Sequence, residues 1–243
     1  MDLPPLIPID EDWERALAIV AHPDDLEFGA AAAVARWTDA GKHVSYCMVT
    51  SGEAGIDAME PAESRALREA EQIESARVVG VDVVEFLGLK DGVLEYGVDL
   101  RAAITSVVRR LRPEIVVTNN FRETWDGEML NQADHIAVGR ATLDAVRDAG
   151  NRWVFTDQLS DGLEPWGGVR QVWASQSPGS RHAVDTTATF DRGVASLEAH
   201  RGYIEGLGWP DFDAEEFLES MARPAGARLG TTFGTTFEVF RTG

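Results

Sequence analysis

The sequence predicts an α/β fold built on one mainly parallel sheet. Short apolar segments recur along the first half of the chain, stretches with helical periodicity separate them, and 243 residues suffice for one domain of this kind. The apolar segments are residues 16–21, 44–50, 83–87 and 115–118. Continuous apolar runs are typical of parallel strands that are buried on both faces. Their alternation with helices predicts a single-domain, doubly wound, Rossmann-like sheet with helices on both faces.

The first strand ends in a cluster of polar residues. Residues 16–21 are followed by His22, Pro23, Asp24 and Asp25. Beyond them, apolar residues recur at the helical positions Leu26, Ala30, Ala33, Val34 and Trp37, and Gly41 follows as a C-terminal cap. We therefore expect a helix directly after Asp25. Open α/β sheets place their ligand crevice at such strand-to-helix turns.

Two interpretations of this turn are open. His22 and Asp25 lie at positions i and i+3 on a turn stiffened by Pro23, so both side chains can face one divalent metal ion such as Zn²⁺. Asp24 would then point toward a water held by that metal. Alternatively, the two aspartates only cap the following helix and meet its dipole, and His22 lies on the surface. Spacing alone does not decide between them.

The later segments continue the same pattern. We expect helices over residues 61–79, 99–111 and 191–203, and a further helix after Asn131, which is a credible N-cap. The loop of residues 119–130 is too long for a simple connection, so it is a candidate active-site segment.

The residues Ala21-His22-Pro23-Asp24-Asp25, followed by a helix rich in small residues, resemble the signature of the PIG-L/LmbE-like family of metal-dependent N-deacetylases. The resemblance favours the metal interpretation. It implies one LmbE-like deacetylase domain over residues 1–243, with a core of about 14–240. It also implies hydrolysis of an N-acetylated amino sugar conjugate or a related N-acyl small molecule, which releases acetate and a free amine.

The resemblance also implies a set of site residues. His135 matches the last histidine of the family's His-x-Asp-His segment, so His22, Asp25 and His135 are the expected metal ligands. Asp24 is the expected general base, and Asp134 is expected to orient His135 or a neighbouring group. The expected metal is Zn²⁺, although the same ligands accept Fe²⁺ or Mn²⁺.

Three more residues are expected to bind substrate because their surroundings resemble the family's motifs. Arg68 matches an Arg-x-x-Glu helix start, Asp91 an Asp-Gly pair, and Glu53 a Gly-Glu-x-Gly loop. Each has a simpler alternative, namely a solvated helix face, turn chemistry or a solvated loop charge.

One position departs from the family pattern. Gln132 stands where the family usually has the first histidine of the His-x-Asp-His segment. A glutamine can donate a hydrogen bond to an oxyanion but cannot transfer a proton to a leaving amine. Asp24 then acts as both general base and general acid, or another residue such as His182 supplies the proton, or the chain has lost turnover. We favour the first possibility.

The amino-acid composition limits the kinds of partner that the protein is expected to bind. The 22 basic and 41 acidic residues give a formal net charge of −19, which disfavours nucleic acid and anionic membrane surfaces. Cys47, the single cysteine, rules out an intramolecular disulfide and is expected to be a buried free thiol. No segment resembles a signal peptide or a membrane span, so we expect a cytoplasmic protein. The sequence allows a homo-oligomer but does not show one.

Three alternative functions remain. The chain could be a catalytically impaired relative that binds a metal or a sugar, or an amidase acting on an N-acyl natural product that is not a sugar. A nucleotide-binding protein ranks last, because no Gly-x-Gly-x-x-Gly follows the first strand and acidic residues stand where a phosphate would bind.

Overall fold

The computed structural model describes residues 4–125, 127–209 and 211–243. Within these ranges it contains the strands β1 (Ile7–Pro8), β2 (Arg15–Val20), β3 (His43–Thr50), β4 (Val83–Leu89), β5 (Ile115–Asn119), β6 (Gln171–Ser175), β7 (His182–Asp185) and β8 (Gly234–Arg241). These eight strands of the described residues form one sheet in the order β1-β7-β8-β6-β5-β2-β3-β4. All neighbouring pairs are parallel except those that β8 makes with β6 and β7. The prediction of a mainly parallel sheet is confirmed.

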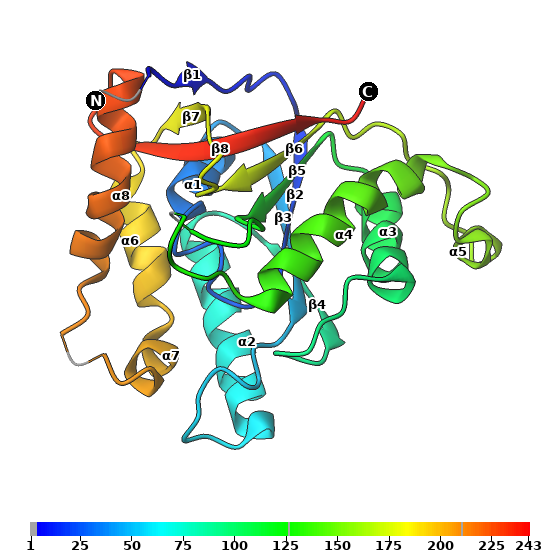
Figure 1. The fold of residues 1–243 in the computed structure, drawn as a ribbon, viewed down its shortest axis with the longest axis horizontal. Helices are drawn as coiled ribbons and strands as arrows, with labels where there is room; N and C mark the ends of the chain where they lie inside the picture. The colour runs from blue at the N-terminus through cyan, green and yellow to red at the C-terminus, as the bar shows by residue number, and fades with distance from the viewer. Residues whose placement is uncertain (1–3, 126, 210) are drawn as a thin grey trace.

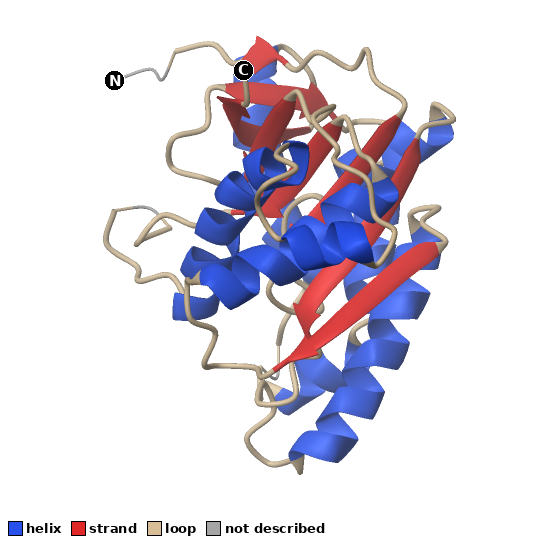
Figure 2. Ribbon diagram, turned by 90° about the vertical axis from the view of Figure 1, so that its right-hand side faces the viewer, coloured by secondary structure: helices blue, strands red, loops and turns tan. Residues whose placement is uncertain are grey.

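Helices cover both faces of the sheet, also as predicted (Figures 1 and 2). The helices are α1 (Ala31–Asp39), α2 (Pro61–Val78), α3 (Val98–Leu111), α4 (Ala133–Gly150), α5 (Thr156–Ser160), α6 (Phe190–Glu198), α7 (Arg201–Gly206) and α8 (Ala214–Leu229). Figure 1 shows α3 and α4 on one side of the strands, and α1, α2, α6 and α8 on the other. Within the described residues, no helix is both long and apolar enough to span a membrane.

Strand β2 contributes side chains to two hydrophobic cores, which lie on opposite faces of the sheet. Because successive side chains of a strand point to opposite faces, Ala18 and Val20 join the core beneath α1, whereas Leu17 and Ile19 join the core beneath α3 and α4. All four side chains are fully buried. This two-sided burial explains why the sequence of the strand is continuously apolar.

The order of the strands creates a switch point beside β2. From β2 the chain extends the sheet through β3 and β4 in one direction, and then returns to add β5 and β6 on the other side of β2. The paired residues of β2 and β5 include Ala16 with Ile115 and Ala18 with Val117. The loops that follow these two parallel strands therefore leave the sheet side by side, which is where open α/β sheets bind ligands.

Two helix predictions were wrong at their boundaries. The first helix begins at Ala31 rather than directly after Asp25, because Asp24 has a left-handed backbone (φ 86°) and residues 21–30 form a series of turns. Leu26 and Ala30 are buried nevertheless. The helix expected over residues 191–203 is divided into α6 and α7, with His200 between them.

Aromatic side chains pack together in the core between the sheet and α1. The rings of Trp13, Trp37, Trp173 and Phe237 lie with their centroids 5.4–6.0 Å apart. Aromatic rings at such separations add to the free energy gained by burying their surface. The predicted burial of the free thiol of Cys47 is confirmed, and burial raises its pKa to about 12.

This core gives a stability prediction. Trp173 is completely buried, so we expect Trp173→Ala to lower the free energy of unfolding by about 3–5 kcal/mol in urea denaturation. Trp153 is 81% exposed, and Trp153→Ala should change it by no more than about 0.5 kcal/mol. Equal losses in the two variants would contradict this assignment of the core.

Candidate active site

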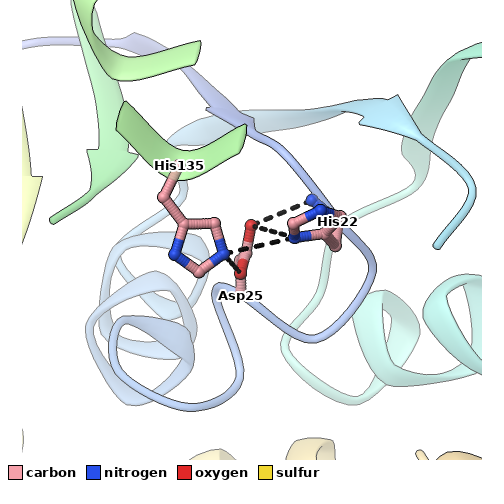
Figure 3. A group of neighbouring side chains, drawn as sticks. All are labelled: His22, Asp25 and His135. Atoms are coloured by element: carbon pink, nitrogen blue, oxygen red, sulfur yellow. Dashed lines mark hydrogen bonds and ion pairs between the residues drawn. The ribbon is translucent and has the colours of Figure 1, made fainter. Parts of the chain in front are cut away.

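Three side chains converge where the loops after β2 and β5 meet (Figure 3). His22 and Asp25 come from the turn after β2, and His135 lies in the first turn of α4. The Nδ1 atom of His22 is 3.2 Å from Nε2 of His135, and Nε2 of His135 is 2.9 Å from Oδ1 of Asp25. The other oxygen of Asp25 is 3.7 Å from His22 Nδ1. The fold thus joins residues that are 113 positions apart in the sequence.

The outward nitrogen of each imidazole faces an oxygen acceptor. His22 Nε2 lies 3.0 Å from Oδ1 of Asp91 and 3.3 Å from Oδ2 of Asp134. His135 Nδ1 lies 2.8 Å from Oδ1 of Asn131. Because these acceptors favour a hydrogen on the outward nitrogen, the neutral form of each ring keeps the lone pair of its inward nitrogen, His22 Nδ1 or His135 Nε2, available to a metal ion.

This arrangement fits a metal ion. Ligand atoms around a tetrahedral Zn²⁺ with bonds of about 2.0–2.2 Å are about 3.4 Å apart, close to the spacings in the cluster of His22, Asp25 and His135. Two nitrogens and a carboxylate oxygen are also ligands that zinc accepts. His22, Asp91 and Asp134 form a second close group, but their contacts are the hydrogen bonds that orient a metal-binding histidine from behind.

Backbone amides fix the carboxylates behind His22. Asp134 accepts hydrogen bonds from the amides of Gly92 (2.7 Å) and Leu94 (3.0 Å), and Asp91 accepts one from the amide of Ala54 (2.8 Å). These bonds hold the carboxylates in place independently of His22. The orientation of His22 is therefore set by two loops that follow neighbouring strands, β3 and β4.

Asp24 is held at both its backbone and its side chain. Its amide donates a hydrogen bond to Oε1 of Gln72 on α2 (2.9 Å), which supports the left-handed backbone at this residue. Its carboxylate forms a buried ion pair with Arg68, 3.1 Å from Nη2. Left-handed backbone in a residue other than glycine costs free energy, and such strain clusters at functional sites.

Arg68 lies beneath this turn and is almost completely buried. Besides Asp24, its guanidinium donates to the carbonyl oxygens of Pro23 (2.6 Å) and Gly52 (3.0 Å). The guanidinium also stacks on the ring of Tyr203, with its carbon 3.8 Å from the ring centroid. Arg68 therefore ties the turn after β2 to the loop after β3 and to α7.

The buried groups of this cluster shift one another's pKa values. Burial opposes a charge on the His22 imidazole, but hydrogen bonds, first to Asp134 and then to Asp25, raise its pKa well above the usual value. Burial also disfavours a charged Asp25, yet the charge and hydrogen bond of His135 hold the pKa of Asp25 well below its usual range. By contrast, burial raises the pKa of Asp24 to about 6, despite the opposing charge of Arg68.

A second buried layer lies behind Asp24. Oε1 of Glu27 accepts hydrogen bonds from Gln72 Nε2 (2.9 Å) and Ser75 Oγ (2.7 Å). Because Glu27 takes the amide group of Gln72, the oxygen of Gln72 is left for the backbone of Asp24. Oε2 of Glu27 lies 3.7 Å from Nε2 of the fully buried His200. Burial raises the pKa of Glu27 to about 7 and lowers that of His200 to about 3, so both groups favour their neutral forms.

A pocket of about 320 Å³ opens onto these residues. The described residues that line it are His22, Asp24, Asp25, Ala54, Gly55, Arg68, Asp91, Gly92, Gln132, Tyr203 and Leu207. Glu53 is not among them, because its carboxylate is turned to Arg65 (3.1 Å) and to the amide of Asp91 (3.3 Å). His182 lines a different groove, on β7.

The structure thus brings most of the expected site residues together. Asp134 contacts His22, one of the two possibilities left by the sequence, and Asn131 rather than Asp134 bonds to His135. Asn131 is not the N-cap that we expected, since this position belongs to Gln132. Sequence reasoning assigned no role to Gln72 or Tyr203. The spacing of four residues between Asn131 and His135 could have predicted their contact, because such residues are neighbours at a helix start. No local pattern in the sequence indicates that Tyr203 lies at the site.

Comparisons with known proteins identify relatives of this chain. The family model for PIG-L, described as GlcNAc-PI de-N-acetylase, matches residues 17–146. The chain is 31% identical to the diacetylchitobiose deacetylase of Thermococcus kodakarensis over 221 residues, which cover 90% of this chain and 80% of that protein. It is 28% identical to a probable N-acetyl-alpha-D-glucosaminyl L-malate deacetylase 2 of Bacillus subtilis over 55% of this chain and 61% of that protein. The solved N,N'-diacetylchitobiose deacetylase of Pyrococcus horikoshii shares the fold, with a TM-score of 0.86, 24% identity, and coverage of 96% of this chain and 85% of that one.

The buried Glu27 predicts a pH dependence of stability. Its pKa in the folded protein, about 7, exceeds the unfolded value, so the folded state binds more protons between these two pKa values and stability falls as the pH rises. In EDTA, we expect the free energy of unfolding of the wild type, relative to Glu27→Gln, to fall by about 3 kcal/mol from about pH 4 to about pH 8.

The matched control for this measurement is Glu63→Gln, because Glu63 lies on the exposed side of α2. This variant measures the effect of removing one exposed carboxylate. A difference for Glu27→Gln that does not change with pH would contradict the raised pKa of Glu27.

Proposed function

The chain belongs to the PIG-L family, and on this basis we propose that it is a metal-dependent N-deacetylase. It removes an acetyl or related acyl group from the amide nitrogen of an N-acetylated amino sugar conjugate or a similar small molecule. One observation carries the proposal: His22 Nδ1, His135 Nε2 and the Asp25 carboxylate converge at ligand spacing beside the strained, buried Asp24.

The proposed metal is Zn²⁺, held by His22, Asp25 and His135. When bound, it would supply a water of lowered pKa and polarise the acyl carbonyl, as catalytic zinc does. Asp91 and Asp134 hold the His22 ring from behind, and Asn131 does the same for His135. Such support keeps the ligands in place whether or not substrate is present.

Asp24 is the proposed general base. Asp24 lines the pocket and lies between two proposed ligands, His22 and Asp25, in the sequence. Arg68 holds its carboxylate and Gln72 its backbone amide. Asp24 takes a proton from the attacking water while the carbon–oxygen bond forms. Its pKa of about 6 leaves it ionised at neutral pH and still able to return the proton. Gln132, at the exposed edge of the pocket, donates a hydrogen bond to the developing oxyanion.

The pocket supports a small substrate. A volume of about 320 Å³ lies at the lower end of the range for small-molecule sites and accommodates a single sugar ring with its acetamido group. Relatives named for diacetylchitobiose and for N-acetylglucosaminyl malate favour an amino sugar. Arg68 and Asp91 line this pocket, so contacts with the substrate remain part of the proposal. Glu53 lies behind Asp91, so we assign it a supporting role.

A metal analysis tests the ligand set. We expect near-stoichiometric zinc in the purified protein, and loss of both metal and acetate release from N-acetylated amino sugars in His22→Ala and His135→Ala. Asp24→Asn should keep the metal, because all three proposed ligands remain, and lose hydrolysis by about 10³-fold or more, because the proton acceptor is gone. His43→Ala is the matched control, since His43 is exposed and away from the site.

Metal retained in both ligand variants would overturn the ligand assignment. A second outcome is that both variants lose the metal as expected but the parent protein hydrolyses no N-acyl compound. This result would favour a metal- or sugar-binding relative. Elemental analysis also decides among zinc, iron and manganese.

The role of Gln132 has its own test. We expect Gln132→Ala to lower kcat by about 10²-fold, the usual cost of losing one hydrogen bond to an oxyanion. Gln132→His introduces a titratable group and should therefore change one limb of the pH–rate profile. A fully active Gln132→Ala together with an unchanged profile would remove Gln132 from the mechanism.

A further inference from the structure

The backbone of Asp24 is held by a side chain from a helix that is distant in the sequence. Asp24 has a left-handed backbone, and its amide donates a hydrogen bond to Oε1 of Gln72 on α2 (2.9 Å). A backbone amide can only donate, so the oxygen end of the Gln72 amide group must face it. This bond reaches the backbone of Asp24 and does not depend on the charge of its carboxylate.

Glu27 determines which end of the Gln72 amide group faces Asp24. Oε1 of Glu27 accepts hydrogen bonds from Gln72 Nε2 (2.9 Å) and from Ser75 Oγ (2.7 Å). Without an acceptor at this position, the amide group of Gln72 could flip and turn its NH₂ toward the amide of Asp24, where two donors would face each other. A glutamic acid side chain keeps an acceptor oxygen whether it is ionised or protonated. The arrangement therefore requires an acceptor at residue 27 and not a charge.

This network of hydrogen bonds is fully enclosed and continues to α6. Ser75 Oγ lies 2.8 Å from Oγ of Ser196 on α6, and the Ser196 hydroxyl also donates to the carbonyl oxygen of Ser75 (3.2 Å). Helices α2 and α6 pack against each other (Figure 1). The side chains of the network are at most 1% exposed, namely those of Glu27, Gln72, Ser75 and Ser196. Mispaired polar groups are costly in such an environment, so the network favours one arrangement.

We propose that Glu27 and Gln72 are positioning residues, which hold Asp24 where it can act as the general base. This inference rests on the proposed function. Neither side chain lines the pocket, so both act through the backbone of Asp24. A small displacement of a reacting group lowers the rate by up to about 10²-fold, even when its cause lies away from the reacting atoms.

The first experiment separates the acceptor at residue 27 from its charge. Glu27→Met removes the acceptor, whereas Glu27→Gln keeps an acceptor oxygen and removes only the charge. With an N-acetylated amino sugar that the wild type hydrolyses, we expect Glu27→Met and Gln72→Met to lower kcat by about 10- to 10²-fold with KM little changed. The conservative variant Glu27→Gln should lower kcat by about threefold at most.

A double-mutant cycle tests whether Gln72 acts through Asp24. Asp24→Asn keeps the backbone amide and lacks the proton acceptor. If Gln72 only positions Asp24, then Gln72→Met should change the residual rate of Asp24→Asn by no more than about threefold. The same loss in this background as in the wild type would overturn the proposal, because Gln72 would then affect the site as a whole.

Two further readouts do not depend on activity. Amide hydrogen exchange at Asp24, followed by NMR, should be at least about tenfold faster in Gln72→Met and Glu27→Met, and little changed in Glu27→Gln. The metal content of all three variants should equal that of the wild type, because the proposed ligands remain.

Gln158→Met is the matched control. Gln158 is a buried glutamine on α5, and it bonds to Arg109 (3.0 Å) and to the carbonyl oxygen of Ala102 (2.8 Å), outside the pocket. This variant loses buried hydrogen bonds of the same kind. It should nevertheless keep the wild-type kcat and the wild-type exchange rate at Asp24.

Equal losses of kcat in Glu27→Gln and Glu27→Met would overturn the proposal, because the charge and not the acceptor would then matter. So would a fully active Gln72→Met, an unchanged exchange rate at Asp24, or a loss of metal from these variants. Should Glu27→Met fail to fold, Gln72→Met and the double-mutant cycle decide the question. In each case an active parent leaves the proposed function standing. A parent that cleaves no N-acetyl amine would overturn the proposed function and this proposal with it.

Discussion

The parallel pairing of β2 with β5 is the constraint on which the site depends. These strands are separated by more than 90 residues, yet their pairing makes the two loops that follow them leave the sheet together. One loop carries His22, Asp24 and Asp25, and the other leads to His135. The hydrophobic cores on both faces of the sheet are large and continuously apolar, so they hold this pairing rigidly. The strand order therefore sets the geometry of the candidate site.

The orientation of His22 depends on a second feature, a pair of carboxylates that backbone amides hold in place. Asp91 and Asp134 contact the outer nitrogen of His22, and both are bonded to the amides of loops from the neighbouring strands. Arg68 adds the complementary link, because one buried cation bonds to two carbonyl oxygens and one carboxylate. A charge buried in this way is tolerated because it is paired and hydrogen-bonded. The result is a site whose reacting side chains have little freedom to rearrange.

Much of the fold could be predicted from local patterns, and much of the site could not. The apolar runs identified four parallel strands, of which β2, β3 and β5 are largely buried while β4 lies at the edge of the sheet and is half-buried. The polar turn after residues 16–21 marked the crevice. The start of α1 was predicted too early. The apolar residues Leu26 and Ala30 are buried, as in a helix, but they lie in a series of turns that precedes α1. Resemblance was needed to connect His22 with His135. The contact of Asp91 with His22 and the place of Tyr203 depend on tertiary packing between distant segments, for which no spacing rule exists.

The left-handed backbone of Asp24 has an evolutionary consequence. Among residues with a side chain, asparagine and aspartate adopt this conformation most readily, so the position is constrained by conformation as well as by chemistry. Most replacements would disturb the turn and be removed by selection for folding. Asparagine would keep the turn and the contact with Gln72, but it would remove both the ability to take a proton and the negative charge that faces the buried Arg68. A lineage that loses hydrolysis through this substitution would therefore keep the backbone of the turn and give up part of its stability.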